Sequence, residues 1–305
     1  MELLPYSPDL AEDLARSYNS IVQGVPHCYA TTSEDWISFL APLIDPTVES
    51  TLHFHKELDA QKLLVAQDRG EILGLAHSVT RKQEKEPDEG IIAFIGYKRG
   101  FRRAGQALLE ASEGFLQSHG IDTIRAFPGA HRYPFYHIET AYLSDRLDHV
   151  QALLGLNGYK NYVGVGFLER PAFKSEIPPY LESYGRISTE ISDRREDRWY
   201  LRVRADAGKK CLGTCECVPF EQFGSLSPEQ QWVWVRWLGI DEEVQGIRLG
   251  LYLLEYALEE MYKIGYRHVV IGVDQANYRA LSMYSNHGFK IFDWTYAFIR
   301  KFGTL

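Results

Sequence analysis

Apolar and polar residues recur along the chain in two patterns. Short apolar runs bounded by glycine or charged residues predict strands, for example at 90–97, 232–240 and 268–274. Longer stretches with apolar residues three or four positions apart predict amphipathic helices, for example over 102–120 and after Gly250. The order of strand, glycine-containing loop, helix and strand is typical of an α/β protein.

The same patterns predict the other elements. Helices are expected from a cap at Ser7 to residue 22, and over 33–44 with a cap at Thr32 or Ser33. A hairpin is expected over 62–79, with its turn at 68–70. The remaining helices are expected over 144–159 and 277–288, and the remaining strands over 2–6, 121–127, 162–170, 197–206, 209–220 and 289–302.

The two halves of the chain resemble each other. Residues 100–121 align without a gap to residues 245–266, so that Arg103 matches Arg248 and Gly105 matches Gly250. The order of elements is also the same in both halves, which indicates two tandem copies of one unit. We therefore expect an N-terminal domain over 1–170, a proline-containing linker over 171–186 and a C-terminal domain over 187–305.

Composition limits the classes of function. Of the 305 residues, 45% are apolar and 24% charged, which is typical of a folded globular protein. The net charge of −8 argues against a nucleic-acid partner. No signal peptide and no apolar run of membrane-spanning length is recognisable, so we expect no membrane association and a cytoplasmic location.

The four cysteines are expected to be reduced. Cys211, Cys215 and Cys217 stand at odd positions, which would place them on one face of a strand as small core residues, and Cys28 stands apart. Their spacing completes no metal-ligand motif, so no metal is predicted.

The loop before the second long helix is a candidate anion site. Gly246 and Gly250 precede a helix N-terminus, where unpaired N–H groups and the helix dipole favour a phosphate. The spacing matches neither the dinucleotide motif nor the P-loop. The alternative is a purely structural turn.

Two motifs carry a resemblance to a known family. Residues 245–250 (QGIRLG) resemble the Q/R-x-x-G-x-G/A loop of the GCN5-related N-acetyltransferases (GNAT). Residues 277–289 resemble the family's N-x-x-A-x-x-x-Y-x-x-x-G-F stretch at every fixed position. As a duplicated chain, the protein is similar to the tandem-domain members typified by mycothiol synthase. The resemblance implies an α/β (α+β) fold of two GNAT-type domains, each a mixed, mostly antiparallel twisted sheet flanked by helices.

The resemblance also implies an N-acetyltransferase that uses acetyl-CoA as cosubstrate, without a metal. Tyr284 would protonate the departing thiolate. Arg248 departs from the family pattern, because a glycine usually stands there. The residues expected to bind acetyl-CoA are Leu238, Gly239, Ile240, Gln245, Gly246, Ile247, Arg248, Leu249, Gly250, Leu251 and Asn277.

The first copy matches the catalytic pattern less well. Leu147 and Leu154 stand where the second copy has Asn277 and Tyr284. The loop with Gly100, Arg103 and Gly105 either binds a CoA-like molecule or persists only as structure. The working site is therefore expected in the second copy.

The acceptor is expected to be a small-molecule amine or a peptide amine. The aromatic segment 127–142, with His131, Tyr133, Phe135, Tyr136 and His137, either lines the acceptor pocket or packs on its own sheet. The base that deprotonates the amine could be Asp241, Glu242 or a water chain. The competing hypothesis is a non-catalytic acyl-CoA-binding or regulatory protein that keeps the GNAT fold.

Overall fold

The chain folds into two compact units. The computed structural model describes residues 1–45, 59–82, 88–129, 133, 135–138, 141–192, 200–220 and 231–303. Unit 1 comprises Met1–Val165 and Asp293–Leu305, and unit 2 comprises Gly166–Phe292. Each unit is one mixed sheet with helices packed on it, so the predicted fold class is confirmed.

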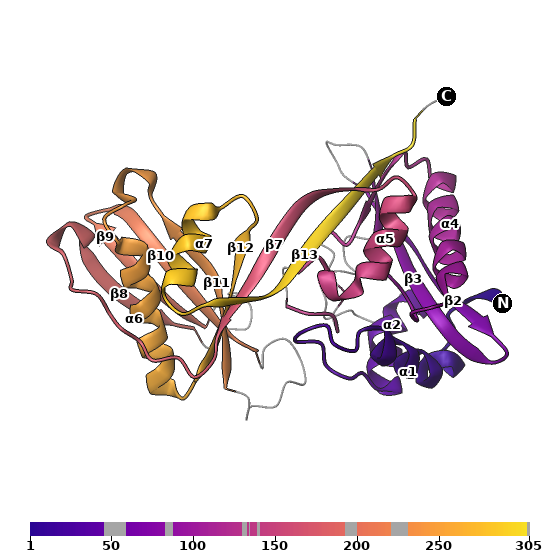
Figure 1. Cartoon of the computed structure of the whole chain (residues 1–305), viewed down its shortest axis with the longest axis horizontal. Coiled ribbons are helices and arrows are strands. Elements are labelled where there is room, and N and C mark those ends of the chain that lie inside the picture. Colours follow the sequence, from indigo (N-terminus) through magenta and orange to yellow (C-terminus); the bar gives the residue numbers. More distant parts are fainter. Residues whose placement is uncertain are drawn as a thin grey trace. The chain divides into compact units, whose positions relative to one another are not determined.

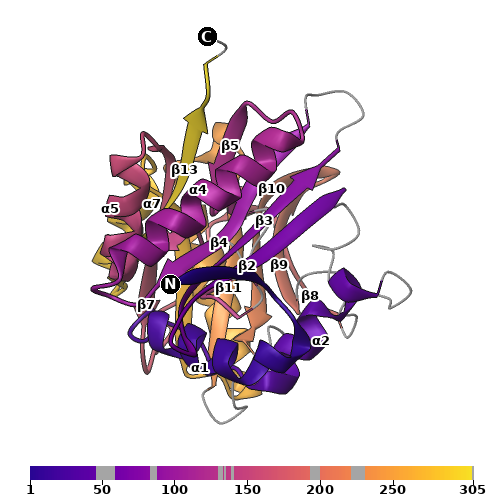
Figure 2. The same cartoon turned by 90° about the vertical axis from the view of Figure 1, so that its right-hand side faces the viewer.

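In unit 1 the strand order is β1-β2-β3-β4-β5-β13, and the contact of β4 with β5 is parallel while β1 to β4 are antiparallel. The strands are β1 (Glu2–Pro5), β2 (Ala60–Asp68), β3 (Glu71–Arg81), β4 (Glu89–Tyr97), β5 (Thr123–Ala126), β6 (Leu143–Ser144), the first part of β7 (Lys160–Arg170) and most of β13 (Lys290–Lys301). The helices are α1 (Ala11–Ile21), α2 (Ser33–Ile44), α4 (Arg102–Ser118) and α5 (Asp148–Leu156), with 3-10 turns η1 (Pro8–Leu10) and η3 (Asp145–Leu147). Figure 2 shows α4 crossing the face formed by β2, β3 and β4.

Of the α-helices described in unit 1, α2 has a side-chain cap. Thr32 and Asp35 form a capping box at the start of α2, so the cap is at Thr32, one of the two predicted positions. Ser7 does not cap, because a 3-10 turn precedes α1 and the Ser7 side chain makes no capping hydrogen bond. The cap predicted at Ser7 is therefore wrong.

In unit 2 the strand order is β7-β12-β11-β10-β9-β8, and only β11 and β12 among β8 to β12 pair in parallel. The strands β8 to β12 are β8 (Arg186–Ile191), β9 (Leu201–Ala207), β10 (Lys210–Pro219), β11 (Trp232–Ile240) and β12 (His268–Asp274). The helical segments are α6 (Leu249–Ile264), α7 (Tyr278–Asn286), η4 (Glu182–Tyr184) and η8 (Glu242–Val244). The apolar face of β9 to β12 packs against α6 and α7 to form the core. None of the helices in the described ranges combines the length and the apolar character that a bilayer span requires.

The cysteines do not share one face. Cys215 and Cys217 are buried in the core of unit 2, as predicted, but Cys211 is exposed. The register of β10 with β9 shifts between Cys211 and Gly213, and this bulge turns Cys211 out of the core. All four cysteines are free thiols.

The two units exchange strand ends. β7 begins in unit 1 and ends in unit 2, whereas β13 begins in unit 2 and ends in unit 1 (Figure 1). At the end of β7, Arg170 bonds Glu255 at 2.7 Å and covers the Phe289 ring at 4.9 Å. At the end of β13, Arg300 makes the equivalent contacts in unit 1, with Glu113 at 2.8 Å and the Tyr159 ring at 5.9 Å.

The exchange makes unit 1 discontinuous in sequence, whereas unit 2 is the single segment Gly166–Phe292. The sequence-based division assigned 187–305 to one domain and 171–186 to a linker. In the structure residues 293–305 belong to unit 1, and residues 166–186 belong to unit 2. β8, which begins at the end of the expected linker, was not predicted.

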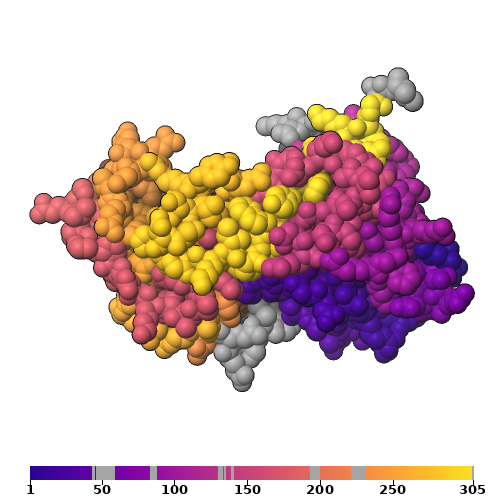
Figure 3. Space-filling view, in the orientation of Figure 1, coloured from indigo at the N-terminus to yellow at the C-terminus, as the bar shows by residue number. Residues whose placement is uncertain are grey.

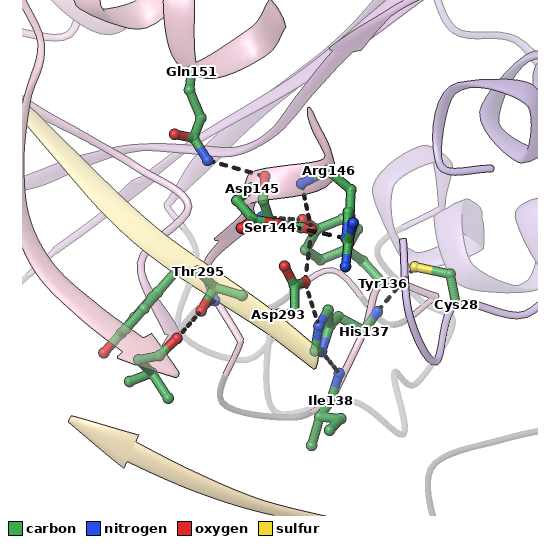
Figure 4. A network of polar contacts seen from close by, with 12 residues as sticks. Cys28, Tyr136, His137, Ile138, Ser144, Asp145, Arg146, Gln151, Asp293 and Thr295 are labelled. Carbon is green, nitrogen blue, oxygen red and sulfur yellow. Dashed lines mark hydrogen bonds and ion pairs between the residues drawn. The ribbon is translucent and has the colours of Figure 1, made fainter. Parts of the chain in front are cut away.

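A buried polar network holds β13 where it enters unit 1 (Figure 4). Asp293 Oδ2 accepts hydrogen bonds from Ser144 Oγ at 2.7 Å and from His137 Nε2 at 2.9 Å. His137 Nδ1 accepts from the Ile138 N–H at 2.7 Å, so the proton lies on Nε2. Burial lowers the pKa of His137 to about 3, so the ring is neutral. Burial, and then a hydrogen bond to Asp293, raise the pKa of Asp145 to about 6.

Candidate active site

The parallel strands β11 and β12 pair over only part of their length. Their register ends where Val235 lies opposite Ile271, although β11 continues to Ile240 in contact with β10. At the point of separation β11 contains one extra residue, Arg236, relative to β10, which is a β-bulge. The bulge turns β11 away, so the backbone of residues 237–240 has one edge that is not paired with β12.

Three predicted site residues lie on this separated segment. Leu238, Gly239 and Ile240 are all half-buried. The indole of Trp237 lies over Gly239, where a methyl group would come within 2.7 Å of the ring nitrogen. An extended ligand can pair with the free edge of such a segment as an added strand.

The loop between β11 and α6 presents backbone N–H groups. Gly246 has φ 91° and Arg248 has φ 68°, both in the left-handed region. No side chain caps α6, which begins at Leu249. The N–H groups of residues 249–251 therefore have no partner within the helix, and they lie at the positive end of its dipole. This geometry suits a phosphate group.

Gly250 marks the place where three elements meet. A methyl group there would contact Ile240 Cγ1 of β11 at 3.4 Å and Met283 Sδ of α7 at 3.9 Å. The side chains of Leu249 and Leu251 are buried in the core, so only their backbone can face a ligand. Gly250 thus leaves this meeting point without a side chain at the start of α6.

Arg248 takes a left-handed backbone conformation that glycine adopts without strain. The left-handed region costs a non-glycine residue about 1–2 kcal/mol. Its side chain is exposed, and it is not among the atoms nearest to Gly250. Arg248 therefore does not fill this meeting point at the start of α6.

Polar side chains connect the loop to its neighbours. Gln245 Nε2 donates to the Ile240 carbonyl at 3.1 Å, and Ile247 accepts at its carbonyl from the Tyr184 hydroxyl at 3.0 Å. Arg279, at the start of α7, donates to Gln245 Oε1. Arg279 was not predicted as a site residue, although it lies inside the N-x-x-A motif. It adds a cation beside the loop.

Asp241 has a structural task. Its side chain accepts from the Glu243 N–H at 3.0 Å and lies 3.2 Å from Lys210 Nζ. The hydrogen bond from Glu243, and then the one from Lys210, lower the pKa of Asp241, so it is a weaker base than an ordinary aspartate. Of the two carboxylates considered as a base, Asp241 is thereby disfavoured.

Tyr284 lies on α7, which is at the surface of unit 2 in Figure 3, and points inward. It is only 5% exposed and packs on Phe289, with ring centroids 5.7 Å apart. Burial, and then the nearby Cys215 thiol, raise the pKa of Tyr284, so the phenol keeps its proton at neutral pH. Cys215 lies opposite Leu238 in the antiparallel pair of β10 and β11, so both side chains are on the same face of the sheet. The Tyr284 phenol, which lies near Cys215, is therefore on the face that carries Leu238.

Asn277 serves first as a helix cap. Its Oδ1 accepts from the Ala280 N–H at 3.1 Å, and α7 begins at the next residue. The role predicted for Asn277 in acetyl-CoA binding stays a prediction. Because the side-chain oxygen caps α7, the side-chain amide nitrogen would make the contact with the coenzyme.

The corresponding region of unit 1, at the end of β4, is packed with its own side chains. The pairing of β4 with β5 ends where Ile92 lies opposite Ala126, the last residue of β5, and every residue of β4 is buried. A methyl group at Gly105 would lie 2.4 Å from the Tyr97 ring, whose hydroxyl donates to the His149 carbonyl at 2.8 Å. This filling favours the structural alternative for the first glycine loop.

The first loop also differs in its backbone. Arg103 lies inside α4, whereas Arg248 precedes α6 in the left-handed region. Leu147 and Leu154, which replace Asn277 and Tyr284, are buried core residues. Gly100 also has φ 91°, but Phe101, the residue that precedes α4, has φ −102° and is not left-handed.

Four described aromatic residues of this segment belong to the interior of unit 1. Tyr133, Phe135 and Tyr136 are buried, and Tyr133 stacks on Phe94 at 4.9 Å. The His137 side chain has no exposed surface. These four side chains pack on their own sheet, which favours the second of the two alternatives for this segment. His131 lies outside the described residues.

Comparison with known proteins gives a family signature for the second copy. Residues 167–289 match the sequence model of the acetyltransferase (GNAT) family. Among curated proteins, none matches the sequence significantly.

Solved structures match nearly the whole chain. A tandem GNAT protein from the clavulanic acid biosynthesis pathway is 12% identical with a TM-score of 0.65, over 100% of this chain and 99% of that one. A GCN5-related N-acetyltransferase from Sphaerobacter thermophilus is 15% identical with a TM-score of 0.63, over 98% and 95%. A glucosamine N-acetyltransferase region of a fungal multidomain β-N-acetylglucosaminidase is 13% identical with a TM-score of 0.67, and the match covers 98% of this chain but 38% of that protein. At these identities the likeness shows the fold. The resemblance to mycothiol synthase in particular stays a prediction.

Proposed function

Since residues 167–289 carry the sequence signature of the GNAT superfamily and the whole chain has the tandem GNAT fold, we propose that the protein is an N-acetyltransferase that uses acetyl-CoA, with its working site in unit 2. One observation carries the proposal: β11 leaves β12 at Arg236 and leads through residues 241–248 to α6, where the N–H groups of residues 249–251 have no partner within the helix. The same geometry in unit 1 is closed by buried side chains.

The separated strand and the loop suit the two ends of acetyl-CoA. The diphosphate would accept hydrogen bonds from the N–H groups of residues 246–251, with Arg248 and Arg279 adding positive charge. The pantetheine arm would extend along residues 238–240 as an added strand. The thioester would then lie near the bulge, within reach of Tyr284.

The reaction is a direct transfer. The neutral amine attacks the thioester carbonyl, the new C–N bond forms, and the C–S bond breaks as the tetrahedral intermediate collapses. The thiolate takes its proton from the Tyr284 hydroxyl, and solvent returns a proton to the phenolate. The proton lost from the amine passes to Glu242 or to water, since the lowered pKa of Asp241 makes it a poor acceptor.

The acceptor is proposed to be a small-molecule or peptide amine. The protein is proposed to act in the cytoplasm, where reduced thiols such as the four free cysteines persist.

The alternative, a protein that binds acyl-CoA without turning it over, is favoured by the filled first copy and by the arginine in the loop. Release of free thiol from acetyl-CoA, measured against a panel of amines, separates the two hypotheses. Transfer to any amine supports the enzyme, and binding of acetyl-CoA without thiol release supports the alternative.

Replacing Arg248 by glycine tests the loop. Glycine accepts φ 68° without strain, so the loop is expected to keep its shape while losing a cation near the diphosphate. We expect acetyl-CoA affinity to fall about 3- to 10-fold, because an exposed charge contributes on the order of 1 kcal/mol. Titration calorimetry at low and high salt provides the measurement.

The matched control is Arg103→Gly, the same change in the first copy. It should leave acetyl-CoA affinity unchanged and cost about 1 kcal/mol of helix stability. An equal loss of affinity in both variants would contradict the assignment of the coenzyme to the second loop.

A further inference from the structure

One face of the unit 2 sheet is polar, and it is the face turned away from α6. Residues directly opposite each other in antiparallel strands share a face. Arg202, Glu216 and Trp237 form such a row across β9, β10 and β11. Their neighbours Cys215 and Cys217 point into the core on the other side.

A charged cluster lies at the point where β11 and β12 separate. Arg202 donates to Glu216 Oε1 from Nε at 2.9 Å and from Nη2 at 2.8 Å. Arg236, the bulge residue, donates to Glu216 Oε2 at 3.2 Å from one Nη atom. Glu216 is 8% exposed, whereas the Arg236 side chain is 27% exposed. One carboxylate thus orients two guanidinium groups that are exposed to a similar degree, and the one at the bulge is Arg236.

A surface groove continues this face across β8 and β9. The Nε of Arg204 donates to no residue in the described ranges. Together the groove and the cluster carry five cationic side chains and three acidic ones, although the chain has a net charge of −8. The groove is lined by Arg186, Ser188, Glu190, Arg204, Asp206 and Lys209.

We propose that the acceptor amine also carries an acidic group, a carboxylate or a phosphate, and that Arg236 binds this group while Glu216 and Arg202 hold its guanidinium in place. The inference rests on the proposed function, because it assumes that the thioester lies beside the bulge. An acceptor that approaches from the polar face meets Arg236 first, since that residue is at the separation itself. The planar guanidinium suits bidentate contact with either acidic group.

The test compares matched pairs of acceptors. Amino acids are paired with the corresponding decarboxylated amines, and phosphorylated amino sugars with the unphosphorylated sugars. The pair with the larger ratio of kcat/KM, acidic over neutral, shows whether the acidic group is a carboxylate or a phosphate. We expect kcat/KM to be at least about tenfold higher for the acidic member of one pair. Arg236→Met should lower kcat/KM for that acceptor about 10- to 100-fold, mainly through KM, with little effect on its neutral partner. Arg236→Lys should recover part of the loss.

Lys263→Met, which removes an exposed cation from α6, is the matched control and should behave as wild type. Equal kcat/KM for acidic and neutral acceptors, or an equal loss for both in Arg236→Met, would overturn the inference while leaving the transferase intact. If no amine is acetylated, the proposed function fails. Binding of the same acidic and neutral amines to the protein is then measured by ligand-observed NMR. Binding of the acidic probes that is lost in Arg236→Met supports the site, and its absence in the wild type overturns it.

Discussion

Replacing Tyr284 by phenylalanine is expected to lower kcat for acetyl transfer about 100- to 10,000-fold, the usual contribution of a positioned acid. The phenol is buried on α7 with a raised pKa, so it holds the proton that the thiolate needs. Phenylalanine keeps the ring that packs on Phe289 and removes only the hydroxyl. The fold and the affinity for acetyl-CoA should therefore change little. Thiol release under saturating acetyl-CoA gives kcat, and titration calorimetry gives the affinity.

The same helix offers a control for that experiment. Tyr278 is 74% exposed, and Tyr278→Phe removes an equivalent hydroxyl without touching the core. It should retain wild-type kcat. A Tyr284→Phe variant with wild-type kcat would exclude the phenol as the acid, and a solvent proton would then have to take its place.

Replacing Asp293 by alanine is expected to have the largest effect on stability. The change leaves two buried donors, His137 Nε2–H and Ser144 Oγ–H, without their acceptor. Each orphaned donor costs about 1–3 kcal/mol, so the free energy of unfolding should fall by about 2–6 kcal/mol. Asp293→Asn keeps one carbonyl oxygen as acceptor and should cost less. Urea denaturation, followed by hydrogen exchange of the β5 amides, measures the change in unit 1.

Asp9→Ala, at an exposed aspartate of unit 1, serves as the comparison and should stay within about 0.5 kcal/mol of wild type. Because β13 enters unit 1 at Asp293, protection of the β5 amides paired with β13 should fall first in Asp293→Ala. Unchanged protection there would show that the network does not hold the strand.

Much of the fold follows from the sequence because its patterns are local. Periodicity located α2, α4, α6 and α7 within a few residues, and the Thr32 cap fixed the start of α2. The duplication followed from two matching loops and helices. β8 was missed because its sequence, RISTEI, is short, partly exposed and follows a proline-containing stretch.

The strand exchange could not be predicted, because the two copies have similar sequences and offer the same contacts to a strand end. Arg170 and Arg300 occupy matching positions, and each unit offers the same kind of partner, a glutamate and an aromatic ring. The local patterns are therefore equally satisfied whether a strand end packs in its own copy or in the other. Only long-range contacts decide between them.

The geometry of the candidate site also depends on both local motifs and long-range packing. The motif located Tyr284, Gly246 and Gly250, and the structure brings their elements together at the end of β11. The bulge at Arg236 has no sequence signature, since any residue can be the extra one. The closing of the first cleft by Tyr97 also depends on packing that no motif records.

The central claim is that the second copy alone holds acetyl-CoA, and the number of molecules bound per chain tests it most directly. Titration calorimetry should give one site per chain in the wild type. Gly250→Glu, which puts bulk and negative charge at the start of α6, should abolish it. Gly114→Glu, at an open position on α4, should bind normally. Two sites per chain, or a site that survives Gly250→Glu, would contradict the account.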